Sequence, residues 1–250
     1  MPTSHIVIPA RLQSTRLPRK LLLNATGKSV LQHTYEAASR AAKPGGVTVA
    51  GDHLEIAAEV ARFGGDFAMT DPDAASGTDR VAEVARGLTG DDIIVNVQGD
   101  EPEIAAEDID AVVQLLEDDP AVPMATLATP IRSQEKLFDP ACVKVVFDAG
   151  GRALYFSRSP IPAVRDWRDE LLTSDPPHFF QHVGLYAYRR EFLLQLAGMP
   201  RCELEQLENL EQLRVLHAGH PIAVGVTLQA SIGIDTPEDY DAFVARRRAG

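Results

Sequence analysis

The first chemistry that the sequence offers is anion binding by a basic loop near the N-terminus. The loop between residues 9 and 20 carries these cationic and hydroxyl side chains: Arg11, Ser14, Thr15, Arg16, Arg19 and Lys20. The chain has a net charge of −12, yet no acidic residue occurs before Glu36. An acidic protein repels anions through its overall field, so it needs a local positive site to bind one. The loop therefore predicts polyphosphate binding. The alternative is a solvated basic loop.

A short strand directly before the loop must position it. Residues 6–8 form an apolar run that is typical of a buried strand, and Pro9, which has no N–H group, is expected to end it. In open α/β sheets, ligands bind outside the carboxyl ends of the strands. The strand therefore predicts that the basic loop lies at a ligand-binding edge of a sheet.

A carboxylate follows a second apolar run, at residues 93–97. Asp100 comes shortly after this run, where an acidic side chain can reach a ligand at the end of a strand. Mg²⁺ usually takes one or two carboxylates together with phosphate oxygens and water, so Asp100 is a candidate metal ligand. The alternative is a turn at residues 99–102 in which Asp100 leads into a helix. The adjacent Glu101 is expected to be solvated or structural.

Strands and helices alternate through the first half of the chain. Helices are expected at residues 29–38, 54–63, 78–88 and 106–116, and further strands at residues 47–50, 67–69 and 93–97. This alternation predicts an α/β fold with a mostly parallel sheet that is covered by helices on both faces.

The second half has a different pattern. Strands are expected at residues 125–128, 143–147, 153–156 and 183–188, with a hairpin turn at residues 148–151. Residues 164–177 predict a mobile loop, and leucines at every third position predict one long helix at residues 203–217. We expect a single domain over residues 1–250, in which a β-rich insertion at about residues 120–190 binds substrate or builds a dimer face.

Composition limits the partners. Apolar residues make up 45% and charged residues 24% of the chain, which is ordinary for a globular domain, and the acidic balance argues against nucleic acid. The two cysteines lack CxxC spacing, which predicts neither a zinc framework nor an oxidising compartment. No signal-peptide pattern and no stretch of ~18 apolar residues is present. We therefore expect a cytoplasmic protein without a membrane partner.

Seven segments of the chain, in order, resemble the 3-deoxy-manno-octulosonate cytidylyltransferase (CMP-Kdo synthetase) family of sugar nucleotidyltransferases. These segments are IPARLQSTRLPRK at residues 8–20, SGTDR at 76–80, NVQGDEP at 96–102, ALYFSR at 153–158, HVGLY at 182–186, LEQLR at 210–214 and GIDTPED at 233–239. Two positions depart from the family pattern: Arg19 stands where the family usually has glycine, and Leu21 where it often has proline. Both departures leave the charged groups in place, but they put the local shape of the loop in question.

The resemblance implies a fold and a reaction. The fold is a Rossmann-like nucleotidyltransferase fold with a β-rich insertion. The reaction is Mg²⁺-dependent transfer of CMP from CTP to the anomeric hydroxyl of Kdo, with release of pyrophosphate, which activates Kdo for lipopolysaccharide synthesis. A homodimer is implied as well. The alternatives are a cytidylyltransferase for another sugar acid, such as 8-amino Kdo or sialic acid, and a nucleotide-binding module without turnover.

The resemblance also implies which residues bind the nucleotide and the metal. The expected nucleotide-binding residues are Arg11, Ser14, Arg16, Lys20, Ser76, Gly77, Thr78 and Arg80. The expected catalytic residues are Arg11, Lys20, Asp100 and Asp235, and the last two are the expected Mg²⁺ ligands. For the segment at residues 76–80, the alternative is an ordinary helix N-cap followed by a surface arginine.

The expected sugar-acid residues lie in the second half of the chain. They are Gln98, Arg158, Arg165, His182, Tyr186, Glu211 and Gln212. An arginine fork suits a carboxylate. His182 and Tyr186 are four residues apart on a predicted strand, which places them on one face. The alternatives are core positions for these two and solvent exposure for Glu211 and Gln212.

Asp235 precedes a predicted helix start. Thr236 suits the N-cap, Pro237 the first helical position, and Asp239 the third position of a capping box. Asp235 is therefore free to point elsewhere, and the resemblance makes it the second metal ligand. The alternative is an acid that only interacts with the helix dipole.

Overall fold

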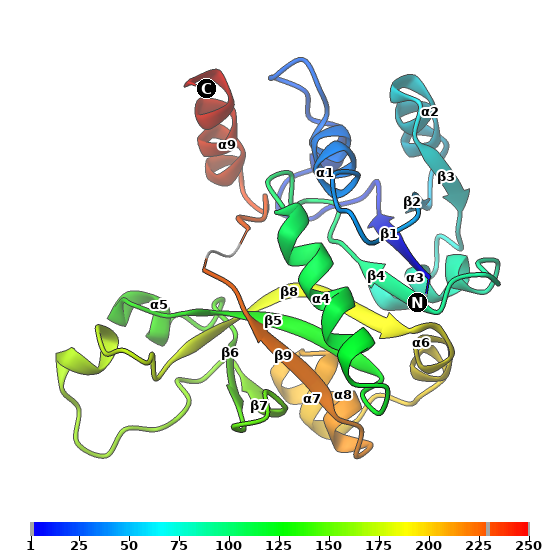
Figure 1. Ribbon diagram of the computed structural model, residues 1–250. Coiled ribbons are helices and arrows are strands. Elements are labelled where there is room, and N and C mark those ends of the chain that lie inside the picture. The colour runs from blue at the N-terminus through cyan, green and yellow to red at the C-terminus, as the bar shows by residue number, and fades with distance from the viewer. Residues whose placement is uncertain (1–2, 229–230, 250) are drawn as a thin grey trace.

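The computed structural model describes residues 3–228 and 231–249, and it has a central mixed sheet with helices on both faces (Figure 1). The strands of its main path are β3 (Asp66–Met69), β2 (Val47–Gly51), β1 (Ser4–Ala10), β4 (Ile93–Asn96), β8 (Phe180–Arg189), β5 (Met124–Pro130) and β9 (Ile222–Val226), in that spatial order. The pairs β1–β2, β2–β3, β1–β4 and β5–β9 are parallel. Strand β8 is antiparallel to both of its neighbours, β4 and β5. The expected mostly parallel, mixed α/β sheet is therefore confirmed.

The α-helices mostly follow the predicted alternation in the first half of the chain. They are α1 (Val30–Ala38), α2 (Leu54–Phe63), α3 (Gly77–Ala85), α4 (Ala106–Asp118), α5 (Gln134–Phe138), α6 (Arg190–Ala197), α7 (Glu203–Glu208), α8 (Gln212–His217) and α9 (Pro237–Ala249). Short 3₁₀ helices lie at Lys20–Leu22 (η1) and Asp169–Leu172 (η2). No helix in the described ranges combines the length and the apolar character that a bilayer crossing requires.

The core lies on both faces of the sheet, which explains the continuous apolar run at residues 6–8 of β1. Ile6 and Ile8 pack into one buried cluster with residues of α1 and α4. Val7 points to the opposite face and packs with residues of α3 and α6. Alternate side chains of a strand point to opposite faces, so a strand covered on both sides must be apolar at every position.

Strand β1 extends further than predicted. Pro9 was expected to end it, but the strand runs to Ala10, and Pro9 pairs in register with Ala50 of β2. On its other edge, β1 pairs with β4 only as far as Val7, whose carbonyl accepts from Val97 N. Pro9 is the next residue on this edge, beyond the end of β4. Its missing N–H group therefore costs no ladder hydrogen bond.

The predicted long helix at residues 203–217 is wrong. Helix α7 ends at Asn209, which has a φ of 51° and a ψ of 51°, and α8 begins at Gln212. Asparagine tolerates the left-handed region better than most residues, so it can end a helix where glycine would otherwise be needed. The leucine spacing continues through the break, because Leu210 and Leu213 are buried on the same side of the sheet.

The predicted hairpin is confirmed. Strands β6 (Lys144–Phe147) and β7 (Ala153–Ser157) pair antiparallel, and Gly151 takes a φ of 73° in the turn. The predicted loop at residues 164–177 contains η2 and buries Leu172 in a small separate cluster with Ile131, Leu137, Cys142 and Phe179.

Candidate functional site

Two adjoining cavities open near the ends of β1 and β4. The loop cavity, named for the basic loop, has a volume of about 750 Å³, and the strand cavity, named for β8, has a volume of about 470 Å³. The residues that line both cavities are Ser76, Gly77, Gln98, Asn209, Glu211 and Asp235. The basic loop therefore lies at a hollowed edge of the sheet, as its position after the first strand predicted.

The basic loop places all four of its predicted site residues on the loop cavity. Arg11, Ser14, Arg16 and Lys20 line it. The loop is anchored at its start, where Leu12 N donates to Asp52 Oδ1 over 3.0 Å.

The two departures from the family pattern have clear structural settings. Arg19 has a φ of 56°, in the left-handed region where glycine is favoured, and its side chain pairs with Glu55. Leu21 is buried and packs in the main core cluster. The loop therefore accommodates both residues while its cationic groups stay on the cavity.

Lys20 lies between the two predicted metal ligands. Its Nζ contacts Asp100 and also lies 2.9 Å from Asp235 Oδ1, and Arg16 Nη2 lies 2.9 Å from the same Asp235 oxygen. Burial opposes the charge of Lys20, but the adjacent Asp100 and Asp235 carboxylates outweigh burial and raise its pKa. The structure thus brings Asp100 and Asp235, which are 135 positions apart in the sequence, to one cationic atom.

The convergence of Asp100 and Asp235 fits a magnesium ion. Both side chains offer hard oxygen ligands to one point beside the basic loop, which is the donor set that Mg²⁺ uses together with phosphate oxygens. Among residues 3–228 and 231–249, no group of three or more acidic, histidine or cysteine side chains forms a metal cluster. The remaining ligands would therefore come from a nucleotide and water.

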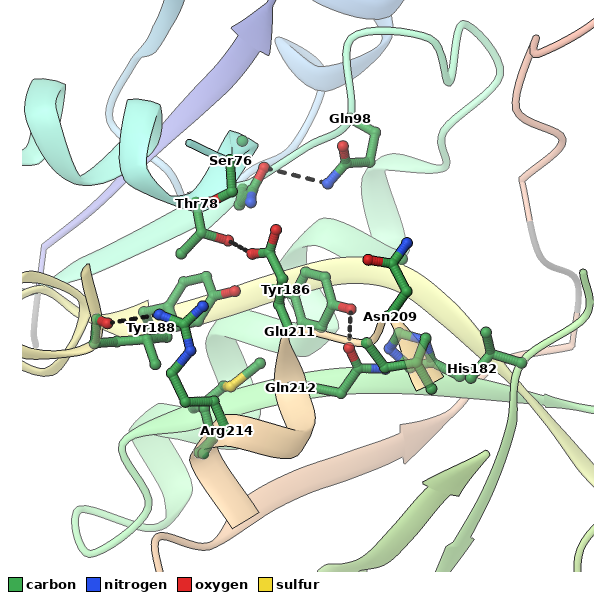
Figure 2. A pocket seen from close by; sticks show the side chains of 18 of the residues that line it. Ser76, Thr78, Gln98, His182, Tyr186, Tyr188, Asn209, Glu211, Gln212 and Arg214 are labelled. Carbon is green, nitrogen blue, oxygen red and sulfur yellow. Dashed lines mark hydrogen bonds between the residues drawn. The ribbon is translucent and has the colours of Figure 1, made fainter. Parts of the chain in front are cut away.

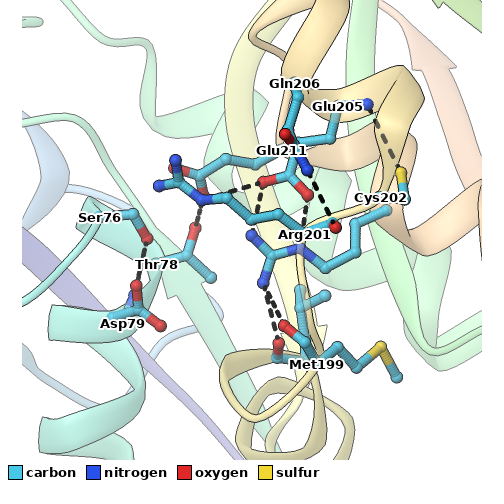
Figure 3. A network of polar contacts seen from close by, with 11 residues as sticks. Ser76, Thr78, Asp79, Met199, Arg201, Cys202, Glu205, Gln206 and Glu211 are labelled. Atoms are coloured by element: carbon cyan, nitrogen blue, oxygen red, sulfur yellow. Dashed lines mark hydrogen bonds and ion pairs between the residues drawn. The ribbon is translucent and has the colours of Figure 1, made fainter.

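The start of α3 forms the wall between the two cavities. Ser76 caps the helix: its Oγ accepts from Asp79 N (3.2 Å) and donates to Asp79 Oδ2 (2.8 Å). Thr78 Oγ1 donates to Glu211 Oε2 (2.6 Å), so this wall is joined to the segment before α8 (Figures 2 and 3). Ser76 is therefore a helix cap that also lines both cavities.

Arg80 is not the surface charge that the alternative expected. It is 1% exposed, and its guanidinium donates to Thr70 Oγ1, to the Asp71 carbonyl (3.1 Å) and to Asp52 Oδ2 (3.4 Å). Asp52 also accepts from the basic loop, so Arg80 supports the loop through a shared carboxylate. Arg80 reaches the loop cavity from this buried position.

Two aromatic side chains of β8 line the strand cavity on one face, as their spacing predicted. The His182 and Tyr186 rings are 5.3 Å apart, although the register with β5 shifts between them. Burial lowers the pKa of His182 to about 3, so its ring is neutral, and its Nε2 lies 3.0 Å from Thr126 Oγ1. Burial also raises the pKa of Tyr186 well above its ordinary value, so Tyr186 keeps its hydroxyl proton.

Gln212 has a free donor. Its Oε1 accepts from the Tyr186 hydroxyl (3.4 Å), but its buried Nε2 has no hydrogen-bond partner among the described residues (Figure 2). A buried polar atom without a partner is costly, which is typical of a position that meets a ligand. Glu211 and Gln212 lie at the start of α8, and they reach the cavity because the chain turns between α7 and α8.

Arg158 and Arg165, two of the predicted sugar-acid residues, line neither cavity. The Arg158 guanidinium donates to the carbonyls of Glu208 (2.6 Å), Pro140 (3.0 Å) and Asn209 (3.4 Å), so it supports the end of α7. Arg165 is exposed on the segment between β7 and β8. In this structure the Arg158 guanidinium therefore makes structural contacts.

The cavities are also lined by residues that sequence reasoning did not select, and three of them are polar or charged residues at the shared edge or wall: Arg201, Asn209 and Glu101. Arg201 and Asn209 border the loop cavity, and Glu101 borders the strand cavity. Glu101 Oε2 accepts from Ser231 Oγ (2.5 Å), and burial raises its pKa to about 7. Only its position after a strand could have indicated Glu101. Nothing in the local sequence around Arg201 does so.

Comparisons with known proteins agree with this geometry. A family model described as Cytidylyltransferase matches residues 5–222. The 3-deoxy-manno-octulosonate cytidylyltransferase of Rhodopirellula baltica is 53% identical over 96% of this chain and 97% of its own length. The protein of the same name from Syntrophobacter fumaroxidans is 48% identical over 95% and 94%. A solved structure of CMP:2-keto-3-deoxy-manno-octonic acid synthetase complexed with CTP superposes with a TM-score of 0.91 and 41% identity, covering 99% of both chains.

Proposed function

Because the chain belongs to the 3-deoxy-manno-octulosonate cytidylyltransferase family, we propose that it transfers CMP from CTP to the anomeric hydroxyl of Kdo and releases pyrophosphate. The observation that carries this proposal is the pair of adjoining cavities. One is lined by the cations of the basic loop and suits a triphosphate, and the other is lined by hydroxyl, amide and imidazole groups and suits a sugar acid. The shared wall at Gln98 and Asp235 is where the two reacting groups would meet.

The basic loop would neutralise the triphosphate. Phosphoryl-type transfer depends mainly on positioning and charge stabilisation, for which arginine and lysine side chains are suited. Arg11, Arg16 and Lys20 would face the phosphate oxygens, and Ser14 would add a hydroxyl donor. Ser76, Gly77 and the buried Arg80 line the loop cavity and would form the wall that meets the cytosine ring, with Thr78 beside them on the strand cavity.

Mg²⁺ is the cofactor that we propose, with Asp100 and Asp235 as the residues that would hold it. The bound ion would supply additional charge neutralisation at the phosphates. The support is that both carboxylates contact the Lys20 ammonium, the cation between them in this structure.

The strand cavity would bind and orient the sugar acid. Tyr186 and neutral His182 offer groups that can hydrogen-bond sugar hydroxyls, and the unpartnered Nε2 of Gln212 can donate to a further oxygen. Gln98 and Glu211 line both cavities and would contact the acid beside the nucleotide.

A pyrophosphate-release assay with CTP, Mg²⁺ and a panel of sugar acids tests the function. The panel contains Kdo, 8-amino Kdo and sialic acid, and reactions without acid serve as the blank. We expect release with Kdo above the other acids. Release only with another acid would identify a sister enzyme, and no release with any acid would leave a nucleotide-binding module.

The cellular setting and the oligomer are part of the same proposal. Activated Kdo would serve lipopolysaccharide synthesis, and the cytoplasm, which supplies CTP, suits the two buried free cysteines. A homodimer is supported by exposed apolar residues on the β6–β7 hairpin and on α7, which are Leu154 (61% exposed) and Leu207 (74% exposed). Sedimentation equilibrium at micromolar concentration tests it, and a mass equal to one chain would exclude the dimer.

A further inference from the structure

The strand cavity poses a charge problem for an anionic substrate. Its charged lining among the described residues consists of the acidic side chains Asp79, Glu101, Glu211 and Asp235 and one cation, Arg214. A sugar acid brings a carboxylate into this acidic surrounding. Bringing an anion into a partly buried site requires a cation or several donors that face it.

Arg214 cannot serve as that cation. Its guanidinium binds Glu205 through two hydrogen bonds (2.7 and 2.5 Å) and donates to the carbonyls of Leu196 (3.3 Å) and Met199 (3.0 Å). The side chain is mostly buried, and the hydrogen bonds to Glu205 raise its pKa. Its donors are therefore already engaged within the protein, and it supports the turn between α7 and α8.

The chemistry of the substrate indicates where the cation must lie. In a 2-keto sugar acid, the carboxylate is attached to the anomeric carbon that carries the attacking hydroxyl. The carboxylate must therefore lie next to the reacting phosphate, at the wall that the two cavities share. The cations that line the loop cavity among the described residues are Arg11, Arg16, Lys20, Arg80 and Arg201.

Four of these five cations are already bound to other side chains or face the proposed triphosphate. Arg80 is buried with its donors engaged. Arg16 and Lys20 contact Asp235 on the phosphate side. Arg11 lies on the basic loop, where its charge would neutralise the triphosphate.

Arg201 lies on the opposite wall, on the segment that joins α6 to α7. Its nearest acidic atom is Glu205 Oε1 at 3.8 Å, and that carboxylate is already neutralised by Arg214. No hydrogen bond of the described residues uses the Arg201 guanidinium, and its side chain is 53% exposed. Figure 3 shows Arg201 in one polar cluster with Thr78 and Glu211, at the shared wall.

We propose that Arg201 binds the carboxylate of the sugar-acid substrate, as a planar fork opposite the basic loop. This inference rests on the proposed function and names the residue that makes the site specific for an acid. The fork replaces the one that Arg158 and Arg165 were expected to supply. It also offsets the charge of Glu211 beside it, so the substrate anion can approach the acidic cavity.

The test compares the sugar acid with its C1 carboxamide in Arg201→Gln, Arg201→Lys and wild-type protein. Loss of a charge-assisted contact raises KM for the acid by about 10- to 100-fold. We expect KM for CTP and turnover of the carboxamide to stay unchanged, so the preference for the acid falls by the same factor. Arg201→Lys should keep part of the preference for the acid over the carboxamide, because lysine retains the charge but not the fork. Arg40→Gln, a substitution of an exposed arginine at the end of α1, is the matched control.

Each other outcome contradicts the proposal. A rise in KM for CTP would place Arg201 on the nucleotide. Equal losses with acid and carboxamide would make Arg201 a support for Glu211, and wild-type kinetics would show that no substrate meets it. The acid used in this test is the one that wild-type protein uses best in the pyrophosphate-release panel. A wrong role for Arg201 is therefore distinguished from a wrong proposed function. No turnover with any acid would overturn both.

Discussion

At the scale of single residues, the central contact is the Lys20 ammonium between two carboxylates. The ammonium contacts Asp100 and Asp235 at once. It is a positive group in the position where the proposed metal would bind, and it also faces the cavity of the basic loop. Lys20 would therefore compete with the proposed metal ion in the free protein and neutralise phosphate in the complex.

Lys20→Ala separates these two effects. Turnover should fall by about 10²–10³, because charge on the phosphates loses a partner in the transition state. Mg²⁺ affinity without nucleotide should rise, because the competing ammonium is gone. Steady-state kinetics and titration calorimetry measure the two changes.

Lys28→Ala is the matched control for Lys20→Ala, because Lys28 forms an exposed ion pair with Glu36 and lines neither cavity. It should leave both turnover and metal affinity as in wild type. Unchanged turnover in Lys20→Ala would mean that the basic loop is only solvated.

At the scale of secondary-structure elements, the break between α7 and α8 presents two of the proposed acid-binding residues. Asn209 ends α7 in a left-handed conformation, and Glu211 and Gln212 follow it at the cavity wall. Arg158 donates to the carbonyls of Glu208 and Asn209 at this break. The break is thus stabilised by the Arg158 side chain as well as by the left-handed backbone of Asn209.

Asn209→Gly and Asn209→Ala form a matched pair, since both remove the side chain. Glycine accepts the left-handed backbone, whereas alanine should cost about 1 kcal/mol of stability there. We expect Asn209→Ala to raise KM for the acid more than Asn209→Gly, because it shifts Glu211 and Gln212. Equal KM values for the acid in the two variants would show that the left-handed backbone of the break does not control acid binding.

The start of α9 separates a structural residue from a proposed metal ligand. Thr236 Oγ1 accepts from Asp239 N (3.2 Å) and Asp239 Oδ2 accepts from Thr236 N (2.9 Å), which confirms the predicted capping box. Thr236→Ala should therefore cost about 1 kcal/mol of stability and keep most activity.

Asp235→Asn should do the opposite and abolish activity with little change in melting temperature. Its carboxylate contacts the exposed Arg16 and the partly buried Lys20 among the ion pairs of the described residues. The exposed pair with Arg16 adds about 0–1 kcal/mol, and Lys20 keeps its contact with Asp100 in the variant. Thermal unfolding and the pyrophosphate assay measure both variants. An active Asp235→Asn at ordinary Mg²⁺ concentration would remove Asp235 from the metal site.

At the scale of the whole molecule, stability depends on a histidine inside the second half of the sheet. His182 stays neutral in the fold because burial lowers its pKa to about 3, whereas an unfolded histidine binds a proton below about pH 6.5. The unfolded chain therefore binds more protons between these pH values. The contribution of His182 is complete above pH 6.5 and is lost as the pH falls through this window.

His182→Gln removes this dependence. The free energy of unfolding should fall less steeply with acid in the variant, by up to about 1.4 kcal/mol per pH unit relative to wild type. Urea unfolding between pH 7.5 and 5 measures the slopes, and His217→Gln on the surface of α8 is the control. Parallel curves for wild type and His182→Gln would contradict the role of the buried ring.

The sequence predicts the first half of the fold better than the second. Strands β1 and β4 contain the continuous apolar runs at residues 6–8 and 93–95 because helices cover both faces, so their pattern is unambiguous. The break at Asn209 leaves the leucine spacing intact, so periodicity cannot detect it. The basic loop and Asp100 come soon after strands, so the sequence points to them. Arg201 lies on the segment after α6 and reaches the site through the packing of α6 against α3.

The shared wall divides the site between the two halves of the chain. The loop cavity, the proposed nucleotide side, is lined mainly by residues after β1, after β4 and at the start of α3. Much of the strand cavity, the proposed acid side, is lined by residues of β8 and of the turn before α8. The chain could therefore change its acceptor by substitutions between residues 180 and 215, which leave the basic loop, Asp100 and Asp235 as they are. A library confined to residues 180–215, selected on different acids, would explore new acceptors with the basic loop, Asp100 and Asp235 held constant.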